Sequence, residues 1–333
     1  MVVEKEAGMA MIKHFFYGMM LAFCLLGRAG AESPKRDLSV LVVVGTEGAK
    51  EYKDRFTHEA DLWRGACEKA NVSCNIIGLK PEEKDKGDAT LLQSFLTSRN
   101  ASSNGQFWLV LIGHGTFDGR EAKFNLRGAD ITAQQLADWL KPIKSPLAII
   151  QTASASAPFL KALAAPNRVL ISATKSADEV FYTRFGDFFA QAISGEKEAD
   201  LDRDDQVSLL EAFLWSSKRV ERFFETEERL ATEHALIEDN GDGVGSRQEA
   251  FIGIHAKPLE EGKAPDGLLA HQWGLILNEV DATLTDALRQ QRTELEKQLE
   301  ALKAQRAKLG DAEYYTQLEA LMLQIAKLYE RGS

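Results

Sequence analysis

The sequence predicts an α/β fold with a mainly parallel sheet, followed by a C-terminal helical hairpin. Short apolar runs bounded by turn residues alternate with segments of helical periodicity, and the connections between them are short. Runs that are apolar over their whole length are typical of parallel strands covered on both faces. From residue 273 onwards the pattern changes to leucines spaced by three, four or seven among charged residues, which indicates packed helices.

The first 31 residues have the features of a secretory signal peptide. Lys13 precedes an apolar run at 15–26, and Ala29-Gly30-Ala31 has the small-residue pattern of a cleavage site. The run is too short for a comfortable membrane span, and no later segment is long and apolar enough for one. We therefore expect an exported protein, periplasmic or extracellular, with no membrane span after cleavage.

The α/β domain is expected over residues 38–252. Its predicted strands are 38–46, 74–79, 107–112, 146–152 and 168–173. Its predicted helices are 51–70, 89–98, 130–140, 156–164 and 184–193, followed by a long amphipathic helix that runs through Phe224. We expect Asp130 to cap the helix that it begins. The polar turn and short extended piece at 117–126 predict a hairpin at the sheet edge.

The remainder of the chain separates into two parts. Residues 253–272 are polar and contain two prolines, which indicates a linker or surface loop. Residues 273–331 predict a coiled-coil-like helical hairpin, with Gly310 ending one helix and Asp311 capping the next. This pattern suits helices that fold back on the domain and helices that self-associate, and both remain open.

Composition limits the classes of ligand. The formal charge of −10 argues against nucleic acid and anionic membranes and is compatible with cation binding. The turn Gly45-Thr46-Glu47-Gly48 lacks the residues of a phosphate-binding loop, so no nucleotide is expected. After signal cleavage two cysteines remain, Cys67 and Cys74, which either pair or stay as buried thiols.

Two predicted strands end in residues that can carry chemistry. His114 lies between two glycines directly after the strand at 107–112. The strand at 146–152 is followed by Ala153 and Ser154. Because ligands of open α/β sheets bind beyond the carboxyl ends of the strands, we expect these two ends to form the functional edge.

This arrangement resembles the legumain and caspase family of cysteine peptidases. The resemblance covers residues 38 to about 230 in element order and rests on the two short stretches around His114 and Ala153. It implies a caspase-like three-layer domain in which His114 is the family histidine, which activates a cysteine at the tip of the following strand. The position that matches this cysteine is Ala153, and a methyl group cannot attack a carbonyl.

The resemblance therefore predicts a pseudo-peptidase that acts by binding a peptide or protein. The alternative is an active hydrolase in which Ser154 or Ser156 acts with His114. A serine nucleophile needs a positioned base and a group that orients that base. Both serines are also well placed to cap the helix that follows them. Without a partner, His114 is more readily interpreted as a structural histidine.

An acidic segment before the long amphipathic helix matches a calcium loop of the EF-hand type. Such a loop places oxygen ligands at its positions 1, 3, 5, 7, 9 and 12. The matching residues are Asp200, Asp202, Asp204, Gln206 (through its carbonyl), Ser208 and Glu211. Asp205 replaces the usual glycine, and aspartate tolerates the left-handed conformation needed there. The sequence predicts calcium at this loop, and the alternative is an acidic cap of the next helix.

A second acidic segment gives a weaker match through Glu238, Asn240, Asp242 and Glu249. A glycine-rich turn is the favoured interpretation of this segment. The two acidic segments together with the C-terminal helices allow a further alternative from another class, a calcium-dependent assembly module.

Overall fold

The computed structural model describes residues 36–332 except 81–86, 103–104, 258–263 and 307. The predicted signal peptide lies outside the described residues and stays a prediction. Among the helices that are described, none has the length and apolar composition that a membrane crossing requires.

A six-stranded sheet forms the centre of the α/β domain, with strand order β2-β1-β3-β7-β8-β9. Its strands are β1 (Leu38–Val44), β2 (Ser73–Ile77), β3 (Gln106–Ile112), β7 (Leu147–Gln151), β8 (Arg168–Ser172) and β9 (Leu236–Glu238). All neighbours pair in parallel except β9, which runs antiparallel to β8. The predicted α/β fold with a mainly parallel sheet is confirmed, although β9 was not predicted.

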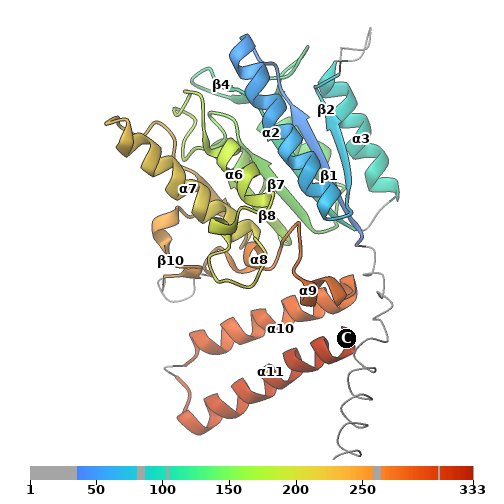
Figure 1. Ribbon diagram of the computed structural model, residues 1–333, viewed down its shortest axis with the longest axis vertical. Coiled ribbons are helices and arrows are strands. Elements are labelled where there is room, and N and C mark those ends of the chain that lie inside the picture. Colours follow the sequence, from blue (N-terminus) through green and yellow to red (C-terminus); the bar gives the residue numbers. More distant parts are fainter. Residues whose placement is uncertain (1–35, 81–86, 103–104, 258–263, 307, 333) are drawn as a thin grey trace, which may run out of the picture. The chain divides into compact units, whose positions relative to one another are not determined.

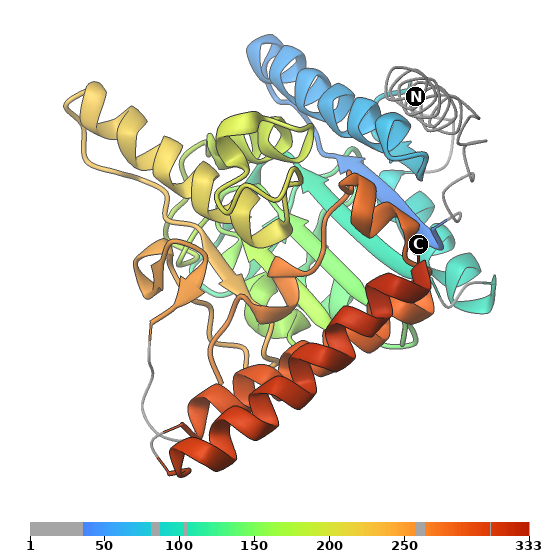
Figure 2. The same cartoon turned by 60° about the horizontal axis from the view of Figure 1, so that its bottom comes forward.

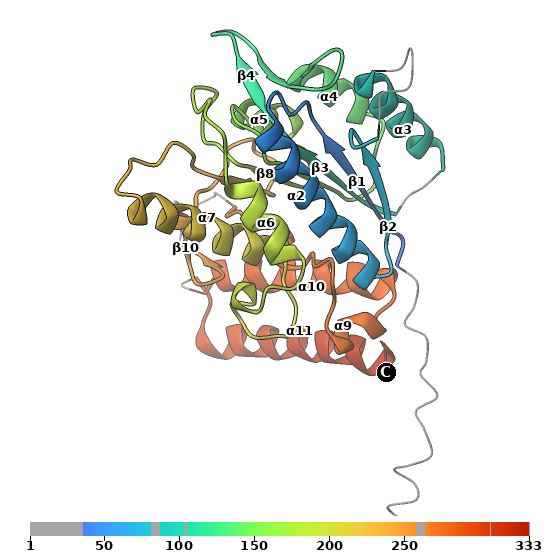
Figure 3. The same ribbon diagram turned by 45° about the horizontal axis from the view of Figure 1, so that its top comes forward.

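Helices cover both faces of this sheet. One layer contains α2 (Lys50–Lys69), α6 (Phe185–Ile193) and α7 (Leu209–Thr226), and the other contains α3 (Asp88–Ser102), α4 (Ala133–Leu140) and α5 (Ala157–Leu163) (Figures 1 and 3). Successive side chains of β1 divide between the layers: Val40 and Val42 pack in the first core, and Leu41 and Val43 in the second. The inner strands are largely apolar because both of their faces are buried, whereas the edge strand β2 is partly exposed and carries Ser73 and Asn75.

A small three-stranded sheet follows His114 and consists of β4 (Gly115–Phe117), β5 (Ala122–Phe124) and β6 (Ile131–Thr132). The antiparallel pairing of β4 with β5 confirms the predicted hairpin. The cap of α4 differs from the prediction. Thr132 and Gln135 form a capping box, while the Asp130 carboxylate accepts a hydrogen bond from the Leu126 N–H. The helix therefore begins two residues later than expected.

Part of the segment predicted as a linker is packed into the domain. It contains β11 (His255–Ala256), which pairs with β10 (Phe251–Ile252), and the short helix α8 (Leu268–His271). Leu269 and Ala270 of α8 are buried in the core. Two short 3₁₀ helices, Lys197–Ala199 and Gln248–Ala250, complete the domain. The first precedes the acidic segment at 200–211, and the second contains Glu249 of the other acidic segment.

The C-terminal pair of helices is also confirmed, with α10 (Asp286–Ala304) in contact with α11 (Asp311–Gly332) (Figure 2). The leucine repeat does not start a single helix at Leu277, however. Asn278 caps a separate short helix, α9 (Glu279–Thr283), and Thr285 caps α10. Each cap residue has an extended backbone and accepts a backbone N–H from the turn that follows, which divides the segment.

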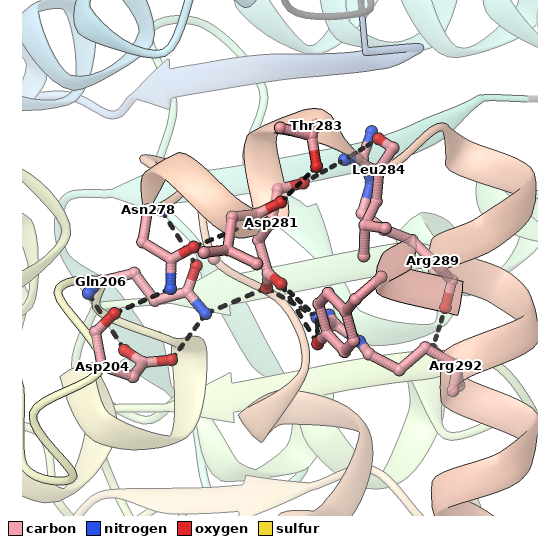
Figure 4. A network of polar contacts seen from close by, with 12 residues as sticks. Asp204, Gln206, Asn278, Asp281, Thr283, Leu284, Arg289 and Arg292 are labelled. Carbon is pink, nitrogen blue, oxygen red and sulfur yellow. Dashed lines mark hydrogen bonds and ion pairs between the residues drawn. The ribbon is translucent and has the colours of Figure 1, made fainter. Parts of the chain in front are cut away.

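A buried ion pair joins α9 to the hairpin (Figure 4). Asp281 and Arg292 are 4% and 6% exposed, and both Asp281 carboxylate oxygens lie 2.7 Å from Arg292 Nη1. The Tyr329 hydroxyl of α11 lies 3.0 Å from Arg292 Nη1. On the other side, Gln206 Nε2 donates to Asp281 Oδ2 and Asn278 Nδ2 donates to the Asp204 carbonyl. These bonds connect the first acidic segment to the C-terminal helices.

Removing one member of this pair should destabilise the protein strongly. Asp281→Ala removes the carboxylate that is hydrogen-bonded to the buried Arg292 guanidinium and leaves only Glu296, whose Oε1 lies 3.8 Å from Arg292 Nε. We expect a loss of about 3–5 kcal/mol in the free energy of unfolding. Urea unfolding followed by tryptophan fluorescence measures this loss. The control is Glu300→Ala, which removes an exposed pair with Lys303 and should cost less than about 1 kcal/mol. Equal effects of the two substitutions would contradict a structural role for the buried pair.

Candidate functional site

The carboxyl ends of β3 and β7 lie side by side, as the sequence predicts. Leu111 is paired with Gln151, and the Thr152 N–H donates to the Leu111 carbonyl at 3.0 Å. A Cβ atom added at Gly115 would lie 2.0 Å from the Ser154 carbonyl oxygen. Only glycine at position 115 permits this approach of the two turns. The second glycine of the Gly-His-Gly motif is thus required by the backbone.

His114 is half-buried in a group of aromatic rings. Its ring centroid lies 4.5 Å from that of Tyr52, 5.1 Å from Phe56 and 6.2 Å from Tyr182. Burial lowers the pKa of His114, opposed by a hydrogen bond to the backbone of Glu47. The imidazole is therefore mostly neutral at pH 7, and a neutral imidazole has one donor and one acceptor nitrogen.

Ala153 and the two predicted serines are all buried next to this turn. The Ser154 hydroxyl accepts a hydrogen bond from the Gly115 N–H at 3.1 Å and donates to the Gly115 carbonyl at 2.9 Å. The Ser156 hydroxyl lies 3.0 Å from the Thr174 hydroxyl and accepts a hydrogen bond from the Thr174 N–H at 3.1 Å. Among the hydrogen bonds of the described residues, none joins His114 to either serine.

Ser156 occupies the residue before α5 but does not cap the helix with its side chain. Its hydroxyl instead links the turn after β7 to the turn after β8, where Thr174 lies. The capping role considered for the serines is therefore replaced by cross-links between neighbouring strand ends. Both hydroxyls hold backbone segments together at the edge where the site is expected.

A buried carboxyl that the sequence analysis did not single out lies in the same region. Glu59 of α2 is 5% exposed and accepts a hydrogen bond from the Thr152 hydroxyl at 3.2 Å. Burial, together with the nearby charge of Asp187, raises the pKa of Glu59 to about 8. Burial and the charge of Glu59 in turn raise the pKa of Tyr182 to about 12. Glu59 is therefore mostly protonated at pH 7.

The position of Glu59 in the sequence is unusual for a carboxyl residue. It lies three residues after Phe56 and four before Trp63, on the apolar face predicted for this helix. A single carboxyl within an apolar stripe indicates either a buried partner or a functional group. Gly186 makes room for it, because a Cβ atom there would lie 2.6 Å from Glu59 Oε1.

The loop between β8 and α6 bonds both to the turn after β7 and to the segment that leads to β9. The Ala155 N–H donates to the Glu179 carbonyl at 2.9 Å, and Ala155 has a positive φ of 50°. The Glu179 carboxylate lies 2.5 Å from His234 Nδ1 and also accepts the backbone N–H of His234. On the outer side of this loop Val180 and Phe181 are 47% and 65% exposed. The loop thus presents apolar side chains while its base is fixed.

The first acidic segment brings three predicted metal ligands together. One carboxylate oxygen from each of Asp200, Asp202 and Asp204 lies within 4.8 Å of the others. Asp200 accepts hydrogen bonds from the Asp204 and Asp205 N–H groups, which closes the loop. Asp205 has φ 67°, the left-handed conformation expected at this position. Three carboxylates at this spacing suit a cation with oxygen ligands.

Glu211 and Ser208 have other bonds in this structure. They form the capping box of α7, in which Glu211 Oε2 accepts from both the N–H and the hydroxyl of Ser208. Glu211 Oε1 accepts from the N–H groups of Leu201 and Asp202. The Gln206 side chain donates to Asp204 and Asp281. Glu211 therefore holds the loop from within, which is the capping role considered as the alternative.

The second acidic segment is a tight turn whose side chains bind its own backbone. Glu238 lies in β9 and accepts from the Gly241 and Gly243 N–H groups, Asn240 accepts from Asp242, and Asp242 accepts from Val244. Glu249 forms an exposed ion pair with Arg247. This is the glycine-rich turn favoured from the sequence.

Cys67 and Cys74 are free thiols in this structure, the first on α2 and the second on β2. Their hydrogen bond to each other, with burial, raises the pKa of Cys67. Their pairing in an oxidising compartment stays a prediction.

No protein-family model and no curated protein matches the sequence. Solved structures do match. The Drosophila initiator caspase Dronc has a TM-score of 0.43 at 14% identity, over 67% of this chain and 89% of that chain. Caspase-1 from Spodoptera frugiperda has a TM-score of 0.40 at 9% identity, over 64% of this chain and 92% of that chain.

Raptor from Chaetomium thermophilum has a TM-score of 0.32 at 11% identity, over 50% of this chain and 19% of that chain. Similarities of this size assign no residue and no activity.

Glu59 should make the stability of the protein depend on pH. The pKa of Glu59 is about 8 in the folded protein, above the ordinary value of 4.5. The stability that protonated Glu59 contributes to the folded state is therefore fully present below pH 4.5 and is lost as pH rises through 8. Glu59→Gln should abolish this part of the decline, which we expect to be on the order of a few kcal/mol. Urea unfolding at several pH values between 5 and 9 provides the measurement.

The control for this experiment is Glu51→Gln, an exposed position on the same helix, which should keep the wild-type profile. Burial also raises the pKa values of Glu233 and Asp266, each to about 7, with the same sign. Only the difference between wild type and Glu59→Gln therefore reports on Glu59. Parallel pH profiles of these two proteins would show that Glu59 ionises as freely in the folded state as in the unfolded state.

Proposed function

We propose that the chain is an exported pseudo-peptidase of caspase-like fold, which binds a peptide or protein at the His114 edge without cleaving it. The observation that carries this proposal is the bonding of the two serine hydroxyls. Ser154 bonds to the Gly115 backbone and Ser156 to Thr174, while Ala153 offers only a methyl group. A nucleophile needs a base within hydrogen-bond reach, and neither hydroxyl has one here.

The same edge retains groups that suit binding. The neutral His114 ring has one acceptor nitrogen, which matches a peptide N–H donor. The exposed Val180 and Phe181 lie on the loop that ends at Tyr182, whose ring contacts the His114 cluster. Neighbouring exposed apolar side chains on a protein surface mark interaction sites more often than chance. An extended peptide with an apolar side chain is therefore the ligand class that we favour.

Hydrolysis of a broad peptide library tests the non-catalytic part of the proposal. Because the nucleophile position is alanine, we expect no turnover above the uncatalysed background for wild type. Wild type, His114→Ala and the exposed control His255→Ala should be indistinguishable. Turnover that is lost only in His114→Ala, or labelling of Ser154 or Ser156 by a serine-directed covalent probe, would favour the active hydrolase instead.

We further propose that the first acidic segment binds calcium. Support comes from the convergence of Asp200, Asp202 and Asp204 and from the left-handed Asp205 that forms the turn. These three carboxylates would hold the ion directly, and Glu211 would fix the loop around them. Calcium prefers carboxylate and carbonyl oxygens, and it would relieve the repulsion among the three negative charges.

Calorimetric titration with calcium tests this site. We expect one site per chain, with Kd on the order of 10⁻⁴–10⁻³ M, as in extracellular calcium modules. Asp202→Asn should weaken binding at least about tenfold, because it removes one negative ligand. The matched control Asp205→Asn keeps a residue that tolerates positive φ and should leave affinity nearly unchanged. Absence of binding heat and of any Tm shift in millimolar calcium would contradict the proposal.

The calcium-dependent assembly module remains a second candidate. It is favoured by the hydrogen bonds that link Asp204 and Gln206 to α9, and by three exposed apolar side chains on α11. Tyr315, Met322 and Leu323 are each at least 50% exposed. Sedimentation of the protein with and without calcium distinguishes the assembly module from the pseudo-peptidase, since only calcium-dependent assembly increases the sedimenting mass.

A further inference from the structure

A pocket of about 240 Å³ lies beside α7, and neither His114 nor any other residue of its aromatic group lines it. Its walls are the C-terminal half of α7, the segment 229–235 that leads to β9, and the turn at 247–249. Its volume is below the roughly 300–1,000 Å³ of pockets for drug-sized ligands, which limits it to a small molecule.

The floor of this pocket is apolar. Phe185, Val220 and Phe224 line it, and each is at most 5% exposed in the folded chain. At the rim Leu230 is 91% exposed, the highest value among the exposed large apolar side chains that the structure describes. An apolar group that enters the pocket would cover Leu230 and contact the two phenylalanine rings. Burial of such a group is the main source of affinity in small pockets.

Most charged side chains around the pocket are already paired. Both Glu233 oxygens accept the N–H groups that begin α6, at Arg184 and Phe185. Three further bonds engage the others: Glu221 with Lys218, Arg247 with Glu249, and His234 with Glu179. These groups need no ligand to balance them.

Two charges of opposite sign are left. Among the described residues, no side-chain hydrogen bond or ion pair engages the Arg229 guanidinium or the Glu225 carboxylate, and both line the pocket. Although they are only four residues apart at the end of α7, no ion pair between them is found in the described part of the chain. Both side chains are exposed to solvent and free to turn toward a bound molecule. A ligand that pairs with both would carry a carboxylate for Arg229 and an ammonium group for Glu225.

We propose that this pocket binds a free α-amino acid with a large apolar side chain. The carboxylate pairs with Arg229, the ammonium group pairs with Glu225, and the side chain lies on Phe185, Val220 and Phe224. This site is separate from the peptide-binding edge at His114 and from the acidic segment at 200–211, so it does not depend on the functions proposed for them.

Calorimetry of the full chain with L-phenylalanine and three analogues tests the site. N-acetyl-L-phenylalanine lacks the ammonium charge, L-phenylalanine amide lacks the carboxylate, and glycine lacks the side chain. We expect L-phenylalanine to bind and each analogue to bind at least about tenfold more weakly, as loss of a charge-assisted bond or of apolar burial requires. Equal affinity for all four compounds, or none for L-phenylalanine, would overturn the proposal.

Substitutions then assign the two charged groups. Arg229→Gln should weaken the binding of L-phenylalanine at least about tenfold and leave the binding of L-phenylalanine amide unchanged. Glu225→Gln should weaken the binding of L-phenylalanine by the same factor and leave the binding of N-acetyl-L-phenylalanine unchanged. Arg222→Gln, an exposed arginine of α7 that does not line the pocket, is the matched control and should bind as wild type does. All three side chains are exposed, so the variants are expected to fold. Binding that is insensitive to Arg229→Gln and Glu225→Gln would refute the assignment.

Discussion

Burial of the parallel sheet on both faces is the constraint on which the rest of the structure depends. The inner strands β1, β3, β7 and β8 are therefore largely apolar, and polar and reactive groups gather at the turns beyond the strand ends. The register of β3 with β7 then places the His114 turn against the Ala153 turn. Gly115 permits their close approach, and Ser154 holds them together through two hydrogen bonds.

Burial also explains the unusual ionisation in this domain. Glu59 lies on the buried side of α2, and Glu233, which precedes β9, has its carboxyl against the first N–H groups of α6. In both places the charged form is poorly solvated. Their pKa values rise, and each receives hydrogen bonds from a neighbouring element. Such groups hold elements together without a buried charge. They also place titratable groups close to both the His114 edge and the pocket beside α7.

The acidic segment at 200–211 shows how one set of residues serves two purposes. Ser208 and Glu211 cap α7, and this cap orients the backbone that brings the three aspartates together. Asp204 and Gln206 continue the network to Asn278 and Asp281, and Arg292 continues it to the hairpin. The charges of this loop are therefore linked to the anchoring of the C-terminal helices.

The sequence by itself determined the α/β class, the five parallel strands, the edge hairpin and the C-terminal helix pair, because periodicity records which faces are buried. It also placed His114, Ala153 and the aspartates at turns, since each lies within one short stretch of the chain. Only the tertiary structure decided the bonding of Ser154 and Ser156, the short strand β9 and the division of the leucine repeat by Asn278 and Thr285. Contacts between residues far apart in the chain, such as Glu59 with Thr152 or Asp281 with Arg292, depend on packing that no local pattern records.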